Sequence, residues 1–195
     1  HRMIRKPILL TCVLLARCAT PMPSSSLGDT EAMIAPKVVF AIPSPATLNQ
    51  TANITQSIVA HFKDQSFSFD AQIQITPNKL DLVALDGFGR RGLTVIWKPE
   101  GVVSQPAPWL PKFIRPADIL ADVALVYWPQ EALAASLSAS GVTLTQTENR
   151  RTISAGDRDL VVVEYGPAEG WNRSAKLRNL VFGYEIDIQS AEILR

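Results

Sequence analysis

Apolar and polar residues alternate most regularly between positions 67 and 76. Phe67, Phe69, Ala71, Ile73 and Ile75 are separated by polar residues. Because successive side chains of a strand point to opposite faces, this period of two predicts a β-strand with one buried face. Shorter stretches bounded by glycine, proline or asparagine predict further strands. They lie at 54–62, 80–86, 93–97, 102–103, 142–147, 151–154, 160–165, 177–182 and 184–193.

The middle of the chain has a helical period instead. Ile119, Leu120, Val123 and Val126 fall on one face of a helix over 118–126. A second helix is predicted over 129–141, between a proline that can open it and a glycine that can end it. Strands with short links around one helical pair predict a mainly β (α+β) fold. We expect an incomplete antiparallel β-barrel of about ten or eleven strands with a helical lid pair.

The first residues have the pattern of an export signal. If the chain starts at Met3, the basic residues Arg5 and Lys6 precede an apolar run over 8–16. This run is shorter than the roughly 20 residues that a helix needs to span a bilayer. Leu15-Ala16-Arg17-Cys18 then resembles a bacterial lipobox, although Arg17 departs from its small residue and leaves open whether processing is impaired. The alternative is an ordinary cleaved signal without lipid.

These features predict the domain organisation. We expect a lipoprotein signal segment at 1–18 with Cys18 as the lipid anchor, a flexible tether at 19–37 that is rich in proline and serine, and a single half-barrel domain at 38–195. By resemblance to lipoprotein sorting rules, Ala19 after the cysteine implies an outer-membrane lipoprotein of the bacterial cell envelope that faces the periplasm.

Charge and composition narrow the class of protein. Four of the 19 basic residues precede Cys18, which leaves 15 against 18 acidic residues and no basic stripe for a nucleic acid. Cys12 and Cys18 are the only cysteines, and His61 is the only histidine after His1. We therefore expect no metal, no cofactor and no catalytic triad, and we expect a protein that is not an enzyme. Asp118 and Asp122 share one face of the first helix, without a nucleophile nearby.

Four separated stretches carry a resemblance to a known family. They are 116–129 with Ala132 and Leu133 after it, 82–89, Arg150-Arg151, and 179–186. In this order, over residues 55–192, they resemble uncharacterised bacterial lipoproteins grouped as domain-of-unknown-function family 3261. That family is similar in plan to the LolA/LolB lipoprotein carriers. The resemblance implies an incomplete barrel around an apolar cavity with helices as a lid.

The alternating apolar residues have two interpretations, because they could line a ligand cavity or fill a closed core. Tryptophans beside the helical pair could form the rim of such a cavity. The candidate cavity residues are Phe67, Phe69, Ile73, Ile75, Leu82, Val95, Trp97, Trp109 and Trp128.

A glycine-rich loop supplies a second candidate site. Phe88 lies between two glycines, and Arg90 and Arg91 follow it. The resemblance to LolB-like carriers implies that Phe88 enters the membrane, where the two arginines could meet lipid phosphates. The alternative is a phenylalanine folded back onto the protein beside a solvated basic turn.

Together these patterns predict an outer-membrane lipoprotein that binds a lipid or lipid-like hydrophobic ligand in the periplasm, with transfer of that ligand as a further step. Its expected partners are a hydrophobic small molecule and, through the N-terminal lipid, the membrane. The alternative is a non-catalytic envelope assembly lipoprotein that binds a protein partner.

Overall fold

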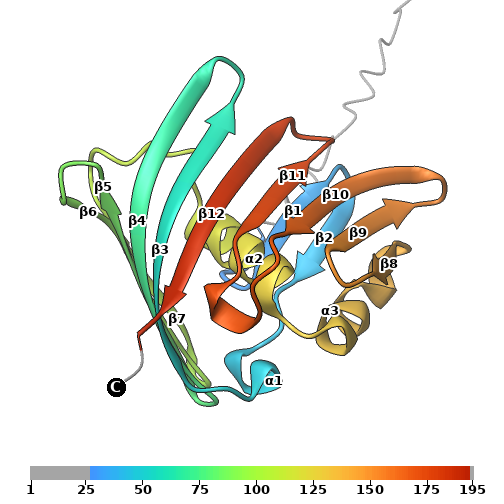
Figure 1. The fold of residues 1–195 in the computed structure, drawn as a ribbon, viewed down its shortest axis with the longest axis horizontal. Coiled ribbons are helices and arrows are strands. Elements are labelled where there is room, and N and C mark those ends of the chain that lie inside the picture. The colour runs from blue at the N-terminus through green and yellow to red at the C-terminus, as the bar shows by residue number, and fades with distance from the viewer. Residues whose placement is uncertain (1–26, 194–195) are drawn as a thin grey trace, which may run out of the picture.

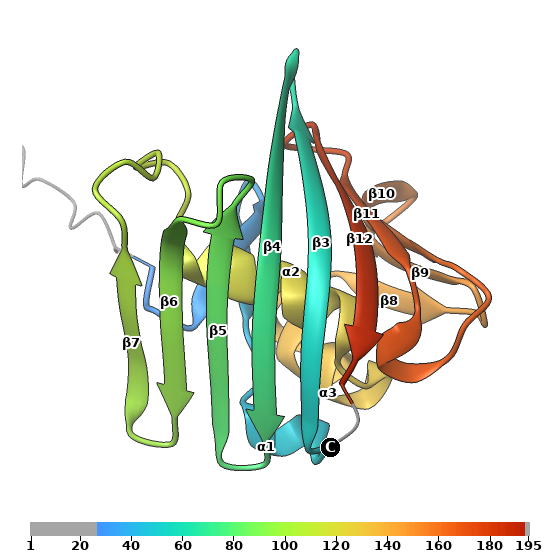
Figure 2. The same cartoon turned by 60° about the vertical axis from the view of Figure 1, so that its left-hand side comes forward.

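The computed structural model describes residues 27–193. Ten strands form one antiparallel sheet in the order β7-β6-β5-β4-β3-β12-β11-β10-β9-β8, whose edge strands β7 and β8 do not pair with each other. The sheet curves strongly, and Figures 1 and 2 show its open form. The predicted incomplete antiparallel barrel is thereby confirmed as an open sheet. The strands are β3 Ala52–Phe62, β4 Gln65–Thr76, β5 Lys79–Asp86, β6 Arg91–Lys98, β7 Gly101–Pro106, β8 Thr143–Gln146, β9 Arg150–Ala155, β10 Arg158–Tyr165, β11 Ala175–Asn179 and β12 Tyr184–Glu192.

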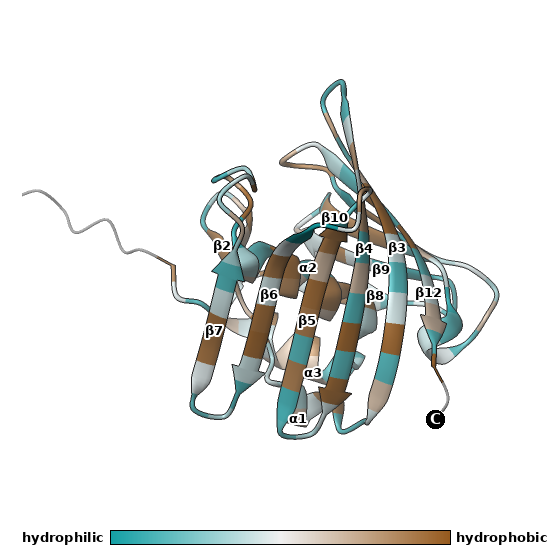
Figure 3. Cartoon of the chain, turned by 90° about the vertical axis from the view of Figure 1, so that its left-hand side faces the viewer, coloured by the Kyte–Doolittle hydropathy of each residue, from teal (hydrophilic) through white to brown (hydrophobic). Residues whose placement is uncertain are grey.

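Strand β4 has the two faces that its alternation predicts. Ala71, Ile73 and Ile75 are buried on the concave side, whereas Gln72 and Gln74 are exposed on the convex side. Brown and teal bands alternate along the strand in Figure 3. Hydrophobic burial on one face of a long strand therefore sets its register with β3 and β5.

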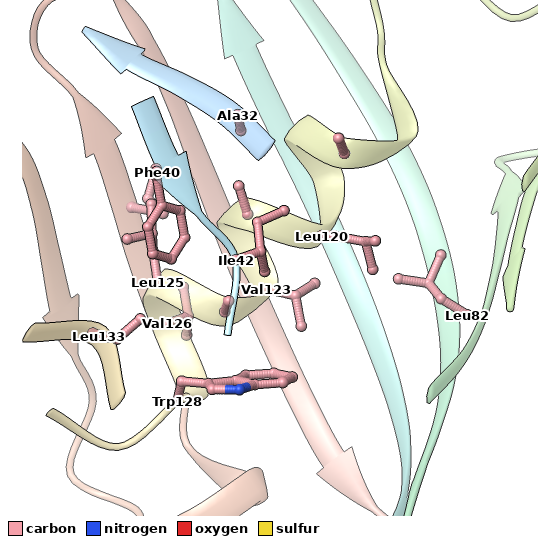
Figure 4. Packing of buried hydrophobic residues seen from close by; sticks show 14 of the residues in the cluster. Ala32, Phe40, Ile42, Leu82, Leu120, Val123, Leu125, Val126, Trp128 and Leu133 are labelled. Atoms are coloured by element: carbon pink, nitrogen blue, oxygen red, sulfur yellow. The ribbon is translucent and has the colours of Figure 1, made fainter. Parts of the chain in front are cut away.

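Helices cover the concave side of the sheet. They are α1 (Pro45–Leu48), α2 (Pro116–Tyr127) and α3 (Gln130–Leu137), with short 3-10 turns η1 (Ser138–Ser140) and η2 (Gly170–Asn172). Figure 1 shows α2 lying within the curve of the sheet, and Figure 4 shows Leu120 of α2 projecting toward Leu82 of β5. The predicted helical pair is confirmed as α2 and α3, and its movement as a lid stays a prediction. Within residues 27–193, no helix is long and apolar enough to cross a bilayer.

The C-terminal end of α2 is fixed by two side chains from the sheet. Arg151 of β9 donates to the carbonyl oxygens of Leu125 and Trp128, and to Oε1 of Gln146. The Tyr165 hydroxyl donates to the carbonyl oxygen of Val126 over 2.7 Å. These bonds satisfy carbonyls that a helix end leaves without partners. They hold α2 at one position above the sheet.

Residues 31–41 correct the predicted domain boundary. Part of the segment expected to be a flexible tether forms β1 (Glu31–Ala35), which pairs with β2 (Val38–Ala41) in a separate hairpin. Ala32 and Ile34 are buried against the core, and Asn179 donates to the carbonyl oxygen of Ile34 over 2.9 Å. Burial of these apolar side chains holds the hairpin against α2. The signal segment 1–18 and the anchor Cys18 lie outside the described residues and stay predictions.

Candidate functional site

A cavity of about 550 Å³ lies between α2 and the end of the sheet that carries the β3–β4, β5–β6 and β11–β12 turns. We call this end the mouth end; Figure 2 shows the three turns together at it. Side chains from β3, β4, β5, β12 and α2 form the wall, and most of them are apolar. The volume lies in the range of roughly 300–1,000 Å³ typical of small-molecule sites.

Small residues on the concave face leave this space open. Ala71 of β4 and Ala84 of β5 are register partners in the sheet, and both line the cavity. Ala60 of β3 lies opposite Phe67 of β4, so a large side chain faces a small one. Well-packed interiors fill such positions with larger side chains. Alanines in the cavity wall are therefore the local reason that the sheet and α2 do not close on each other there.

Three of the nine candidate cavity residues lie in the cavity wall. They are Phe67, Phe69 and Leu82. The wall also contains apolar residues of β3 and β12 that the sequence prediction missed, among them Ile58 and Ile186. The cavity thus occupies the half of β4 nearest the mouth end.

The other six candidates lie outside the cavity, which corrects the prediction. Five of them are buried: Ile73, Ile75, Val95, Trp97 and Trp128. The strand residues among them point to the concave face. Ile73 and Val95 are the register partners of Leu82, at the inner end of the cavity. Ile75 and Trp97 lie farther from the mouth end, where α1 contacts β4 and β5. The indole nitrogen of Trp128 donates to Thr47 Oγ1 and to the Ser44 carbonyl at α1. Trp109 is partly exposed, and the Arg90 guanidinium lies 4.8 Å from its ring centre.

A polar group faces the cavity from α2. Asp122 and Asp118 both line it, and the Tyr184 hydroxyl of β12 donates to Asp122 Oδ1 over 2.9 Å. Burial raises the pKa of Asp122 to about 7; the hydrogen bond from Tyr184 opposes the shift, and the nearby Asp118 adds to it. Burial also raises the pKa of Asp118, although Arg115 opposes that shift. Near neutral pH, Asp122 can therefore exist in either protonation state.

Gln56 of β3 is a second polar group in the cavity wall. Its side chain is only 3% exposed. Its Nε2 donates to the Tyr127 hydroxyl over 2.9 Å and to Ser190 Oγ over 3.1 Å. Its Oε1 is buried and has no hydrogen-bond partner among the described residues. Such a group costs free energy unless a water or a ligand reaches it.

Large apolar side chains are exposed around the mouth end. Met33, Phe113 and Phe182 line the cavity and are also exposed to solvent, and Leu180 is exposed in the β11–β12 turn. Asn179 organises this turn, because its Oδ1 accepts hydrogen bonds from the backbone nitrogens of Val181 and Phe182. Exposed apolar groups that gather at a cavity opening are typical of interaction surfaces.

The Phe88 loop forms the β5–β6 turn at the same end. Phe88 is 89% exposed, which contradicts the folded-back alternative. Asp86 accepts hydrogen bonds from the backbone nitrogens of Phe88 and Arg90, and Arg90 Nη2 lies 2.6 Å from Asp86 Oδ2. Burial would raise the pKa of Asp86, but these bonds from Arg90 and Phe88 lower it below its ordinary value. Arg91 is exposed beside this turn, and membrane contact by Phe88, Arg90 and Arg91 stays a prediction.

One group on the convex face has the composition of a metal site. His61, Glu185 and Asp187 have ligand atoms within 4.8 Å of one another. Lys176 Nζ already lies 2.6 Å from Glu185 Oε1 and 2.8 Å from Asp187 Oδ1. An ammonium group therefore supplies the positive charge that these carboxylates need, and the arrangement is an ion-pair network.

The open antiparallel sheet and its apolar cavity define a half-barrel protein. The chain belongs to the family described as "Protein of unknown function (DUF3261)", whose model matches residues 53–192. Among solved structures it is similar to a LolA superfamily protein, NE2245 from Nitrosomonas europaea. The identity is 11%, the match covers 83% of this chain and 92% of that chain, and the TM-score is 0.41. No curated protein matches the chain.

Proposed function

We propose that this protein binds a lipid-like hydrophobic ligand in the cavity between α2 and the sheet. The observation that carries the proposal is the cavity of about 550 Å³, which is walled mainly by apolar side chains. Water in such a space has few hydrogen-bond partners, whereas each methylene group buried there contributes about 0.8 kcal/mol. An acyl or polyene chain is therefore a better occupant than water.

We further propose that the cavity lies close to the membrane surface. Leu27 lines the cavity, so the described part of the chain begins beside it. If Cys18 carries a lipid, the nine residue steps between Cys18 and Leu27 span at most about 30 Å. A protein tethered to the outer membrane in this way keeps its opening close to the bilayer surface. The exposed Phe88 and Phe113 would meet that surface first, which suits transfer of the ligand to or from the membrane.

A filled cavity tests this proposal. Ala84→Phe places an aromatic ring inside the cavity, whereas Val83→Phe places the same ring on the opposite face of β5. We expect an apolar fluorophore to bind the wild type and Val83→Phe with similar affinity, and Ala84→Phe at least ten times more weakly. Equal binding by all three proteins, each with a native circular dichroism spectrum, would rule out the cavity as the binding site.

An assembly role that uses a protein partner is the second candidate. The observation in its favour is the edge strand β7, where Val103 is 61% exposed. An edge strand can pair with a strand of another chain. A partner that purifies with the wild type and is lost in Ser104→Pro, which removes a backbone donor that points away from β6, would support this role.

A further inference from the structure

The polar groups of the cavity are arranged as acceptors of hydrogen bonds. Asp118 and Asp122 face it from α2, and Gln56 faces it from β3. Tyr184 occupies Asp122 Oδ1, and no hydrogen bond within residues 27–193 engages Asp122 Oδ2. The buried Oε1 of Gln56 also has no partner among these residues. A ligand that enters the cavity therefore meets the carboxyl groups of α2, where Asp122 Oδ2 can accept a hydrogen bond.

The basic residues of the wall are already engaged elsewhere. Arg115 Nη2 donates to the carbonyl oxygens of Gly28 and Glu31, and its Nη1 lies 3.7 Å from Asp118 Oδ1. His61 bonds to Ser66 and lies 3.4 Å from Asp187 on the convex face. No other basic side chain of the described chain lines the cavity. An anionic group inside would thus face two carboxyl groups in an apolar medium, where repulsion is weakly screened.

From this arrangement we infer that the cavity selects amphiphiles whose head donates hydrogen bonds, an alcohol or an amine, and discriminates against carboxylate and phosphate heads. The inference rests on the proposed function and names the ligand class. Asp122 Oδ2 accepts a hydrogen bond from the head group, and Tyr184 fixes the orientation of the Asp122 carboxyl group. The apolar wall contacts the hydrocarbon chain of the ligand. The raised pKa of Asp122 agrees with this role, because a neutral carboxyl group can also bond to an alcohol.

Three probes of equal chain length test the inference. Dodecanol, dodecylamine and dodecanoate compete at pH 8 for the cavity with a neutral apolar fluorophore, below their micelle concentrations. We expect the alcohol and the amine to displace the fluorophore at concentrations at least ten times lower than dodecanoate. In Asp122→Asn, the advantage of the amine over dodecanoate should shrink about tenfold. Asp159→Asn, which removes an exposed charge on β10, should leave the order unchanged.

The outcomes separate this inference from the proposed function. A fluorophore that does not bind the wild type overturns the carrier proposal and the inference with it. If the fluorophore binds but dodecanoate competes as well as dodecylamine, the inference is wrong and the cavity remains a ligand site. The same holds if Asp122→Asn binds the fluorophore normally and keeps the wild-type ratio between the competing concentrations of dodecylamine and dodecanoate.

Discussion

At the scale of single residues, Asp122 is a carboxyl group whose surroundings oppose ionisation. Burial raises its pKa to about 7, against an ordinary value of 3.8. Tyr184 of β12 and the acidic Asp118 on the same helix are the ionisable groups that face it. Arg115 lies about two helical turns from Asp122, beside Asp118. At a pH between 3.8 and about 7, Asp122 therefore keeps its proton in the folded protein and has lost it in the unfolded chain.

Stability should therefore fall as the pH rises from about 4 to about 7. Asp122→Asn removes the ionisation, so its advantage over the wild type should appear at pH 8 and vanish near pH 4. At about 1.4 kcal/mol per pKa unit, a rise from 3.8 to about 7 corresponds to about 4 kcal/mol at pH 8. Solvent reaches the half-buried side chain and screens its charge, so the expected gain is on the order of 2 kcal/mol. Urea unfolding at both pH values measures it. The raised pKa of Asp118 acts in the same direction, so the slope of stability with pH should become smaller without disappearing. An equal difference between the two proteins at both pH values would refute this explanation.

Arg151 is a residue whose surroundings the sequence prediction did not capture. Arg151 is only 4% exposed and holds the end of α2. Burial lowers the pKa of its guanidinium group. Arg151→Met should reduce the free energy of unfolding by about 3 kcal/mol, because buried carbonyls lose their partners. The matched variant Arg150→Met removes exposed ion pairs with Glu164 and Asp159 and should cost less than about 1 kcal/mol. Similar losses in chemical denaturation would contradict the capping role.

At the scale of elements, the β5–β6 turn presents Phe88 in one conformation. Asp86 binds two backbone nitrogens of this turn, and Gly89 has the positive φ of 76° that its shape requires. A turn fixed in this way displays Phe88 without the entropy cost of ordering a mobile loop at the membrane.

Phe88→Glu should weaken association with lipid vesicles several-fold while fluorophore affinity stays unchanged. The matched variant Val103→Glu changes another exposed apolar residue, on the edge strand β7. Vesicle flotation of the chain without its lipid anchor compares the two proteins with the wild type. Equal flotation of Phe88→Glu and the wild type would remove the turn from the membrane-contact model.

The sequence predicted long elements better than short ones. The alternation of β4 and the apolar face of α2 extend over many residues. The pattern of each element alone therefore predicts which of its side chains are buried. The β1–β2 hairpin has short strands, and its burial depends on α2, which lies far along the chain. The apolar residues from Ala32 to Phe40 could have indicated it, with Pro36-Lys37 as the turn between them. The adjacent segment rich in proline and serine favoured a tether instead.

At the scale of the whole molecule, the sheet provides one concave face with two environments. Near α1 that face is a filled core, and near the mouth end it is the wall of the cavity. Periodicity shows which residues of β4 point inward, but it cannot show which part of the strand α2 covers. Phe67 and Phe69 therefore line the cavity while Ile73 and Ile75 do not. Tyr184 and Gln56 escaped prediction because their roles depend on contacts between distant segments.

The position of the protein in the cell depends on the predicted anchor. Cys18→Ser removes the lipid attachment site, so the protein should move from the membrane fraction to the soluble fraction of cells that express the full chain. Metabolic labelling with a fatty acid gives an independent measurement and should be lost in the same variant. Membrane retention by an unlabelled Cys18→Ser protein would show that another feature holds it there.

We expect an apolar ligand to occupy the cavity beneath α2. Native mass spectrometry of the full chain, extracted from bacterial membranes with a mild detergent, tests it most directly. We predict a non-covalent adduct of lipid mass on the wild type and on Val83→Phe, and its loss from Ala84→Phe. Bare protein in all three samples, or an adduct that Ala84→Phe retains in full, would contradict the claim.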